Sequence, residues 1–234
     1  MRVVSLTTHL RMGREKPASG FPVWVYSRAV KKMCVSLLSL LTLVGLTVAG
    51  CQATRAGYES APYRVIRADG KVQVRDYPAL MVVETSRAAH SRDGGDGSFG
   101  RLFRFITGGN ERKEKIAMTT PVFMTGDDTN ATMAFVLPAA MRSADVPRPT
   151  DSGVTVRELP AGRFAVLRYN GGRGADREAA MLDKLKAWME TAGLPVLSAP
   201  VYGYFDPPWT PAWLRRNEVM LRTEPAAGSD EPRL

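Results

Sequence analysis

The sequence predicts an α+β protein built from a duplicated β-α-β-β unit with two helices. Its main sign is that the octapeptide VQVRDYPA at residues 72–79 returns 82 residues later as VTVRELPA at residues 154–161, with six of eight positions matching in identity or charge type. Each copy is followed by the same order of patterns: a further strand, a loop, one amphipathic helix and two more strands. Two long copies do not make a solenoid, which stacks several short units. We therefore expect one domain of two halves with a two-fold groove between them.

The first half of the predicted domain extends over residues 62–138. Asp69-Gly70 lies between two alternating runs and is a two-residue hairpin signal. The predicted strands of this half are residues 63–67, 72–75, 80–85, 116–124 and 132–138. Residues 88–97 are rich in Asp, Gly and Ser, which predicts a loop before the first helix.

The first helix has an apolar face that is open to two interpretations. The face consists of Phe99, Leu102, Phe103 and Ile106, at positions i, i+3, i+4 and i+7. Such a stripe is the usual form of a helix that packs on a core. It also suits one wall of a groove for a flat hydrophobic ligand, because Arg101 and Arg104 beside it could pair with carboxylates at the rim of that ligand.

The second half extends over residues 152–224, after a Pro-containing linker at residues 139–151. Its predicted strands are the repeated one and residues 163–169, 201–205 and 218–222, with a helix over residues 176–192. Gly193 and Pro195 end that helix. We interpret the run Arg215-Arg216-Asn217-Glu218 as charges that fix the fold through ion pairs or backbone hydrogen bonds, in preference to ligand contacts. Residues 225–234 read as a flexible polar tail.

Residues 30–50 have the features of a secretory signal, since two lysines precede a 17-residue uncharged stretch, 34–50, that ends in small residues. The sequence Val-Ala-Gly-Cys that ends at Cys51 resembles the lipobox of bacterial lipoproteins, in which the signal is cleaved before the cysteine and the cysteine is acylated. An uncleaved anchor helix with a chance cysteine is the alternative. Acyl chains on Cys51, at about 0.8 kcal/mol per buried CH₂, would anchor the chain to a membrane, with residues 51–61 as a tether.

Two further expectations concern the N-terminal part of the chain. Residues 1–29 fit neither a signal nor a domain, and a start codon assigned too far upstream explains them. Gln52 follows the cysteine, where aspartate is associated with retention in the inner membrane. We therefore expect a protein of the bacterial cell envelope, lipid-anchored at the periplasmic face of the outer membrane of a Gram-negative-like cell.

Composition argues against several classes of function. The chain carries a net charge of +9, but residues 1–50 hold seven Lys/Arg against one acid, which leaves 25 basic and 22 acidic residues and a net of +3 for the remainder. Nucleic-acid binding has little support from so small a surplus. His90 is the only histidine after the signal, so a nucleophilic triad is not indicated. The residue spacings of zinc sites and of calcium loops are absent as well.

Three motifs resemble the SOUL, or heme-binding protein, family over residues 63–224. They are Lys115-Ile116-Ala117-Met118-Thr119-Thr120-Pro121-Val122, the preceding Phe105-Ile106-Thr107-Gly108-Gly109-Asn110, and Gly203-Tyr204-Phe205-Asp206-Pro207-Pro208 running to Arg215-Arg216-Asn217-Glu218-Val219. The resemblance implies a distorted antiparallel β-barrel made of two β-α-β-β repeats with two flanking helices. It also implies reversible binding of heme or another tetrapyrrole, without a catalytic reaction common to the family.

The resemblance further implies site residues. In one branch of the family, a groove beside the first helix places an apolar residue on the porphyrin and a basic residue near a propionate, and these positions match Phe103 and Arg104. In another branch an axial histidine has been proposed at the position of Asp76, and aspartate is a poor ligand of heme iron. His90 is then the nearest candidate iron ligand, with Tyr77 behind it.

Three hypotheses of function follow. The first is non-catalytic binding of heme or a related tetrapyrrole, with Phe99, Leu102, Phe103, Arg104, Ile106 and His90 as the binding residues. The second is a structural or protein-interaction module of the cell envelope without a cofactor, whose protein partner is unknown. The third is a tetrapyrrole-modifying enzyme, for which Asp76, Glu84 and His90 are the conceivable proton carriers.

Overall fold

The computed structural model describes residues 32–39, 57–87, 97–125 and 131–224 of the chain. The chain divides into two compact units, residues 1–47 and 48–234, and the first is helical and exposed at residues 32–39. Among the described residues, no helix is both long and apolar enough to cross a membrane. Cys51, His90, most of the predicted signal and the predicted tail lie outside the described residues.

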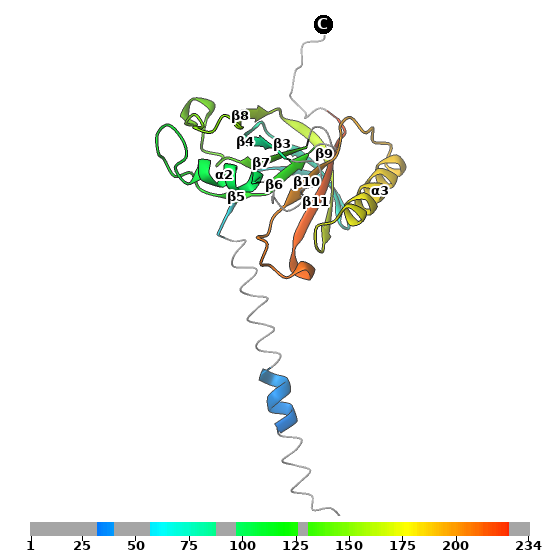
Figure 1. Ribbon diagram of the computed structural model, residues 1–234. Coiled ribbons are helices and arrows are strands. Elements are labelled where there is room, and N and C mark those ends of the chain that lie inside the picture. The colour runs from blue at the N-terminus through cyan, green and yellow to red at the C-terminus, as the bar shows by residue number, and fades with distance from the viewer. Residues whose placement is uncertain (1–31, 40–56, 88–96, 126–130, 225–234) are drawn as a thin grey trace, which may run out of the picture. The chain divides into compact units, whose positions relative to one another are not determined.

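The second unit contains one nine-stranded antiparallel sheet that curls into a half-barrel (Figure 1). Its strand order is β2-β3-β9-β11-β10-β6-β7-β4-β8. The strands are β2 (Arg64–Asp69), β3 (Val72–Tyr77), β4 (Leu80–Ser86), β6 (Val122–Thr125), β7 (Thr132–Val136), β8 (Val154–Leu159), β9 (Gly162–Asn170), β10 (Val201–Tyr204) and β11 (Arg216–Arg222). The other elements are the parallel pair β1 (Glu59–Ser60) and β5 (Thr119–Thr120), the helices α2 (Ser98–Ile106) and α3 (Ala175–Thr191), and the short 3₁₀ turns η1 (Ser143–Asp145) and η2 (Ala212–Leu214).

The strand order shows the duplication. The elements β3, β4, α2, β6 and β7 correspond in sequence order to β8, β9, α3, β10 and β11. In the sheet, the eight strands from β3 to β8 are arranged symmetrically: each strand of one set lies as far from one end as its counterpart lies from the other. A pseudo-two-fold axis therefore passes between β6 and β10. The first strand of each half pairs with the other half, β3 with β9 and β8 with β4. The predicted α+β fold of two repeats is therefore confirmed, and the swapped first strands hold the halves together.

Both helices cover the convex face of the sheet. Successive side chains of a strand point to opposite faces, so the partners of neighbouring residues show which face each helix covers. On β4, Val83 packs in a core cluster with Leu102, Phe105 and Ile106 of α2, while Val82 belongs to a separate cluster on the concave face. In the same way, α3 buries Leu185 and Met189 against β9 and β11. The concave face carries no helix among the described elements (Figure 1).

Two details differ from the sequence-based expectation. A short strand, β1, precedes residue 62 and pairs with β5, and Ala61 is buried in the core. The single strand expected over residues 116–124 is divided at Pro121 into β5 and β6, since proline has no N–H to give to the ladder.

A buried ion pair joins β3 to β11 across β9. Arg75 donates from Nη1 to Glu218 Oε2 at 2.8 Å and from Nη2 to Oε1 at 3.1 Å, and the two side chains are 3% and 1% exposed. Arg216 adds a bond of 2.7 Å to Glu218 Oε1. The expectation that the charges at residues 215–218 fix the fold is confirmed by these pairs.

A second, more exposed pair lies along the same seam between β3 and β9. Arg163 donates to both carboxylate oxygens of Asp76, at 2.7 and 3.2 Å, and Arg64 of β2 donates to the same carboxylate at 3.2 Å. The hydrogen bonds from Arg163 lower the pKa of the Asp76 carboxyl below its usual value, against the effect of burial and with help from Arg64. Asp76 is therefore occupied by structural contacts and is not free to bind a metal.

We predict that Arg75→Gln destabilises the fold by about 3 kcal/mol, because it leaves the buried Glu218 carboxylate with one cation in place of two. The matched control is Arg157→Gln in the second repeat, whose half-exposed ion pair with Glu84 should be worth about 1 kcal/mol or less. Chemical denaturation of both variants measures the two losses. Equal losses would contradict the structural role assigned to Arg75.

We also predict that the stabilisation from Asp76 depends on pH. Because the folded-state pKa lies below the unfolded value of about 3.9, the stabilisation is complete above that value and is lost as pH falls through the folded pKa. Asp76→Asn should therefore lower the free energy of unfolding at pH 7, and the difference from wild type should shrink at about pH 3. Denaturant unfolding at the two pH values tests this, and a difference that does not change with pH would refute it.

Candidate functional site

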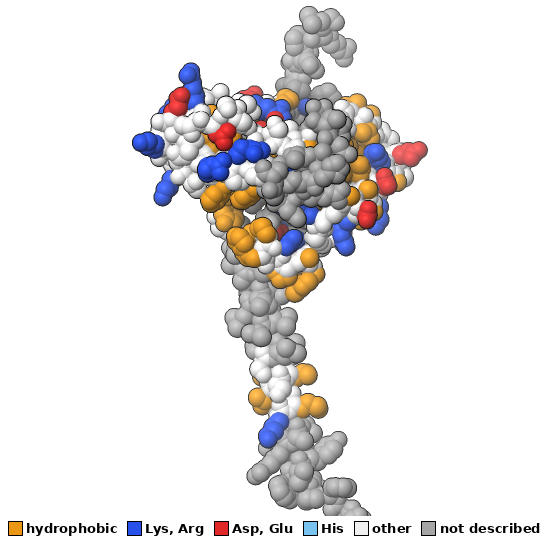
Figure 2. Space-filling model, in the orientation of Figure 1, with side chains coloured by type: hydrophobic (Ala, Val, Ile, Leu, Met, Phe, Trp, Pro, Cys, Tyr) orange, Lys and Arg blue, Asp and Glu red, His pale blue; other side chains and the backbone are white. Residues whose placement is uncertain are grey.

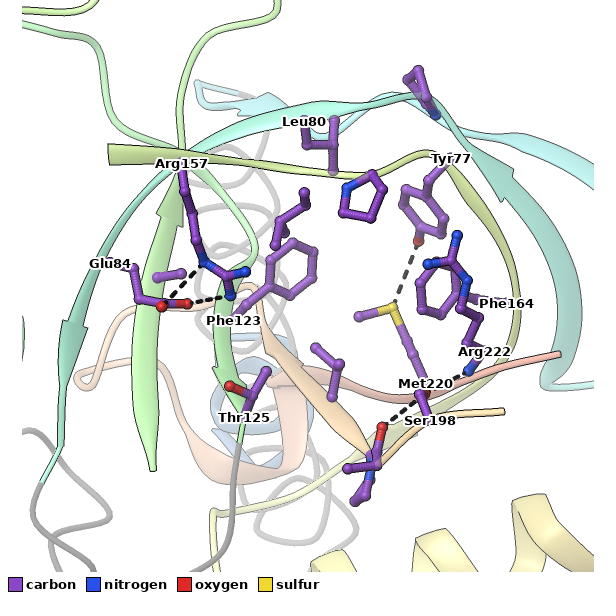
Figure 3. Close-up of a pocket in the computed structure, with 17 residues that line it drawn as sticks. Tyr77, Leu80, Glu84, Phe123, Thr125, Arg157, Phe164, Ser198, Met220 and Arg222 are labelled. Carbon is purple, nitrogen blue, oxygen red and sulfur yellow. Dashed lines mark hydrogen bonds and ion pairs between the residues drawn. The ribbon is translucent and has the colours of Figure 1, made fainter. Parts of the chain in front are cut away.

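An apolar pocket of about 340 Å³ lies on the concave face of the sheet and is lined by both halves of the domain (Figure 3). The side chains that form its apolar walls include Tyr77, Leu80, Phe123, Leu159, Phe164 and Met220. The volume falls at the lower end of the range for small-molecule pockets, which is about 300–1,000 Å³. The predicted groove between the two copies thus corresponds to a real hollow.

The ends of the two repeated octapeptides lie side by side and both line this pocket. Tyr77 and Pro78 come from the end of the first copy, and Leu159 and Pro160 come from the equivalent end of the second. The swapped first strands bring these ends together. Leu159 pairs with Leu80 of the first half, and Tyr77 pairs with Gly162 of the second. The prolines end the strands because they cannot donate to the ladder, and the chain turns there into β4 and β9.

Two arginines stand at opposite sides of the apolar space (Figure 3). Arg157 is 48% exposed and makes two hydrogen bonds to Glu84, at 3.1 and 2.7 Å. Arg222 lies over the Phe164 ring, 5.6 Å from its centroid, and donates to the carbonyl oxygen of Ala161. The pocket therefore combines an apolar floor with cationic groups at its rim.

Tyr77 points into the pocket toward Met220 (Figure 3). Its hydroxyl donates to Met220 Sδ at 3.8 Å and accepts a hydrogen bond from Arg75 Nη1 at 3.1 Å. Burial raises the pKa of the Tyr77 phenol to about 12, so the phenol is protonated at neutral pH. Tyr77 consequently offers a phenol rather than a phenolate, and Met220 offers a thioether that already accepts this bond.

The structure places the predicted residues of α2 away from this pocket. Leu102 and Ile106 are buried in the core under the helix. Phe99 and Phe103 are 39% and 46% exposed. Their rings stack with centroids 5.9 Å apart and form an outward apolar pair. Arg104 is exposed, with its Nη2 3.6 Å from a carboxylate oxygen of Asp151. None of the five predicted α2 residues lines the pocket, and their role in ligand binding stays a prediction.

The other candidate residues divide between structural contacts and unknown placement. Glu84 lines the pocket but is held by Arg157. His90 lies outside the described residues, so its role as an iron ligand stays a prediction too. No group of three or more His, Cys, Asp or Glu side chains that could hold a metal ion occurs in the described part of the chain.

Sequence reasoning missed Phe164, Met220 and Arg222. The repeat that identified the fold also marked this place, because the Pro-Ala ends shared by its two copies are where the two halves meet. The strand register that brings β9 and β11 beside them could not be read from the sequence.

Comparison with solved structures agrees with the fold. The C-terminal domain of EcmrR has 12% identical residues and a TM-score of 0.52, with 70% of this chain and 98% of that chain covered. An uncharacterized conserved protein from Listeria innocua has 12% identity and a TM-score of 0.51, with 66% and 92% covered. At such low identity these likenesses show the fold alone.

Comparison at the level of sequence families is more specific. No curated protein matches the chain. The family model described as SOUL heme-binding protein matches residues 58–222, which include every strand of the large sheet and both helices. The chain therefore belongs to the SOUL heme-binding protein family.

Proposed function

We propose that this protein binds heme or a related tetrapyrrole without catalysis, in the concave pocket of a lipid-anchored domain in the bacterial cell envelope. The observation that carries the proposal is the apolar pocket between the repeats of a SOUL-family domain, with an arginine on each side. The envelope location rests on the lipobox-like sequence ending at Cys51 and on Gln52 after it.

The pocket residues fit the chemistry of a tetrapyrrole. Phe123, Phe164 and Leu159 offer flat and branched apolar surface to the ring system, and aromatic side chains bind such rings through stacked or edge contacts. Arg222 and Arg157 are cations for the carboxylates of the ligand, and Arg157 would exchange its Glu84 partner for one of them. A volume of about 340 Å³ would enclose part of the ring and leave an edge in solvent.

Iron ligation contributes little in this proposal. Among the described residues of the pocket, the donors suited to heme iron are the Tyr77 phenol and the Met220 thioether, and these are hydrogen-bonded to each other. When bound, heme would supply redox or gas-binding chemistry at its iron. Binding itself would rest on apolar burial and on the arginines, so the pocket would accept a porphyrin with or without iron.

The absence of catalysis is also part of the proposal. A general acid or base works best with a pKa near the operating pH. Tyr77 has a pKa of about 12, and Glu84 is held by two hydrogen bonds from Arg157. The Tyr77 phenol is therefore not poised to transfer a proton at neutral pH, and both oxygens of the Glu84 carboxylate are bonded to Arg157, which supports binding over turnover.

The interaction-module hypothesis keeps one specific observation in its favour. Phe99 and Phe103 form an exposed, stacked pair on α2 with Arg104 beside them. This face is also where the family resemblance places the porphyrin. The two places can be separated by mutation because α2 does not line the pocket.

We predict that Val201→Trp, which fills the pocket from β10, weakens binding of protoporphyrin IX by at least about tenfold, equal to 1.4 kcal/mol. The matched variant Phe103→Asp/Arg104→Glu on α2 should leave the affinity within about twofold. Fluorescence titration measures both, with circular dichroism to show that each variant is folded. The reverse pattern would move the site to α2, and loss in neither variant would favour the interaction module.

We further predict that hemin and iron-free protoporphyrin IX bind with dissociation constants within about fivefold of each other, because no histidine or cysteine lines the pocket among the residues that the structure describes and Tyr77 is bonded to Met220. The His90→Ala variant should leave both constants and the Soret band of the hemin complex unchanged. Much weaker binding of the iron-free ligand would show that a protein side chain ligates the iron, and a Soret shift on changing His90 would identify His90 as that ligand.

A further inference from the structure

Two tryptophans project from the segment between β10 and β11. Trp209 is 78% exposed and Trp213 is 63% exposed, the highest values among the large hydrophobic side chains of the SOUL domain that the structure describes. An aromatic side chain of this size typically buries 150–250 Å² in a contact. Two of them exposed together mark a surface that meets an apolar partner.

The segment is held in shape from inside, so the two indoles are presented rather than loosely attached. Arg215 donates to the carbonyl oxygens of Thr210, at 2.7 Å, and of Pro208. Thr210 is buried, and Asp206 accepts a hydrogen bond from the backbone N–H of Arg216 at 2.6 Å. These bonds hold the inner side of the loop, while both indoles are exposed.

The loop lies at the same end of the sheet as β1, the first strand that the structure describes. The last residue of β10, Tyr204, pairs with Val122, and the N–H of Ala61 bonds to the carbonyl of Thr120 at 2.8 Å. The segment between β10 and β11, residues 205–215, is called the Trp loop. Its start and the strand β1 therefore lie at the same end of the sheet (Figure 1). Figure 2 shows hydrophobic side chains gathered at this end, over the η2 segment.

The length of chain that precedes β1 limits how far this end can be from an anchor at Cys51. Eight residue steps separate Cys51 from Glu59. At 3.3–3.6 Å per residue, they span at most about 29 Å when fully extended. A chain acylated at Cys51 would keep the Trp loop within reach of the bilayer surface.

The charges beside the loop suit phospholipid headgroups. A polar hollow next to the start of β11 is lined by Lys71 and Arg168, together with Arg216, which is paired with Glu218, and none of its lining residues is acidic. Basic side chains near a membrane surface are attracted to anionic lipids by about 1 kcal/mol each. Tryptophan itself concentrates at the membrane interface, where its ring is buried and its N–H stays hydrated.

We propose that Trp209 and Trp213 insert into the interface of the bilayer that carries the lipid anchor, so that the domain is docked on the membrane and not only tethered to it. This inference rests on the lipid anchoring proposed above.

The test uses the full chain, expressed in a bacterial host that acylates lipoproteins and reconstituted into phosphatidylethanolamine and phosphatidylglycerol vesicles. In the loop reporter, Trp24→Phe and Trp188→Phe leave Trp209 and Trp213 as the only indoles. In the matched control reporter, Trp24→Phe, Trp209→Phe and Trp213→Phe leave Trp188, which lies on α3 and donates to Asp69 at 2.9 Å. Flotation and quenching by brominated acyl chains are measured on the same samples.

Docking is supported if both reporters float and brominated lipid quenches the loop reporter by about twofold while sparing the control, as expected for indoles at the interface. Flotation without quenching of the loop reporter overturns docking and leaves the anchor standing. Failure to float overturns the anchor and docking together. A blue-shifted loop emission that depends on protein concentration without lipid shows that a second copy covers the tryptophans, which also overturns docking.

Discussion

The buried ion pair between Arg75 and Glu218 ties the first strand of the first repeat to the last strand of the second. The two residues are 143 positions apart, and β9 lies between their strands. A charged pair with so little exposure is costly to form and more costly to break, because loss of Glu218 would leave Arg75 without its buried carboxylate and loss of Arg75 would leave Glu218 with Arg216 alone. The register of β3, β9 and β11 is thereby fixed, since a slip of one residue would point Arg75 to the other face.

The same arginine also shapes the pocket. Arg75 Nη1 reaches Tyr77, whose hydroxyl then points to Met220 on the pocket wall. The guanidinium of Arg75 also lies over the ring of Tyr63, with Cζ 4.2 Å from the ring centroid. Tyr63, which directly precedes β2, thus covers the guanidinium. Stability and the geometry of the candidate site are therefore coupled through one side chain.

The equivalent arginines of the two repeats, Arg75 and Arg157, have different roles. Arg157 occupies the equivalent position in the second octapeptide, yet it is 48% exposed and pairs with Glu84 at the pocket rim. The reason is that β2 pairs with the outer edge of β3, whereas β8 is the last strand of the sheet in the described part of the chain. One copy is enclosed and holds the fold, and the other stays accessible to a ligand.

How much could be predicted from the sequence depended on whether a feature was local. The octapeptide repeat sufficed for the α+β class and the groove between halves, because strand and turn patterns are local. The apolar pattern of α2 was ambiguous: Leu102 and Ile106 belong to two overlapping stripes, and the core took the stripe that includes Phe105 and left Phe99 and Phe103 outside. Phe164 and Met220 enter the pocket through strand register, which no local pattern contains.

The hairpin of β10 and β11 relates the pocket to the proposed docking surface. Val201 and Arg222 line the pocket at one end of these strands, and the Trp loop leaves from Tyr204 and returns at Arg216 at the other. Six residue steps along β11 between Arg216 and Arg222 correspond to about 20 Å. With Trp209 and Trp213 in the interface, the arginines of the pocket would lie on the side of the domain away from the bilayer. A ligand would then be exchanged with the aqueous compartment and not with the lipid phase.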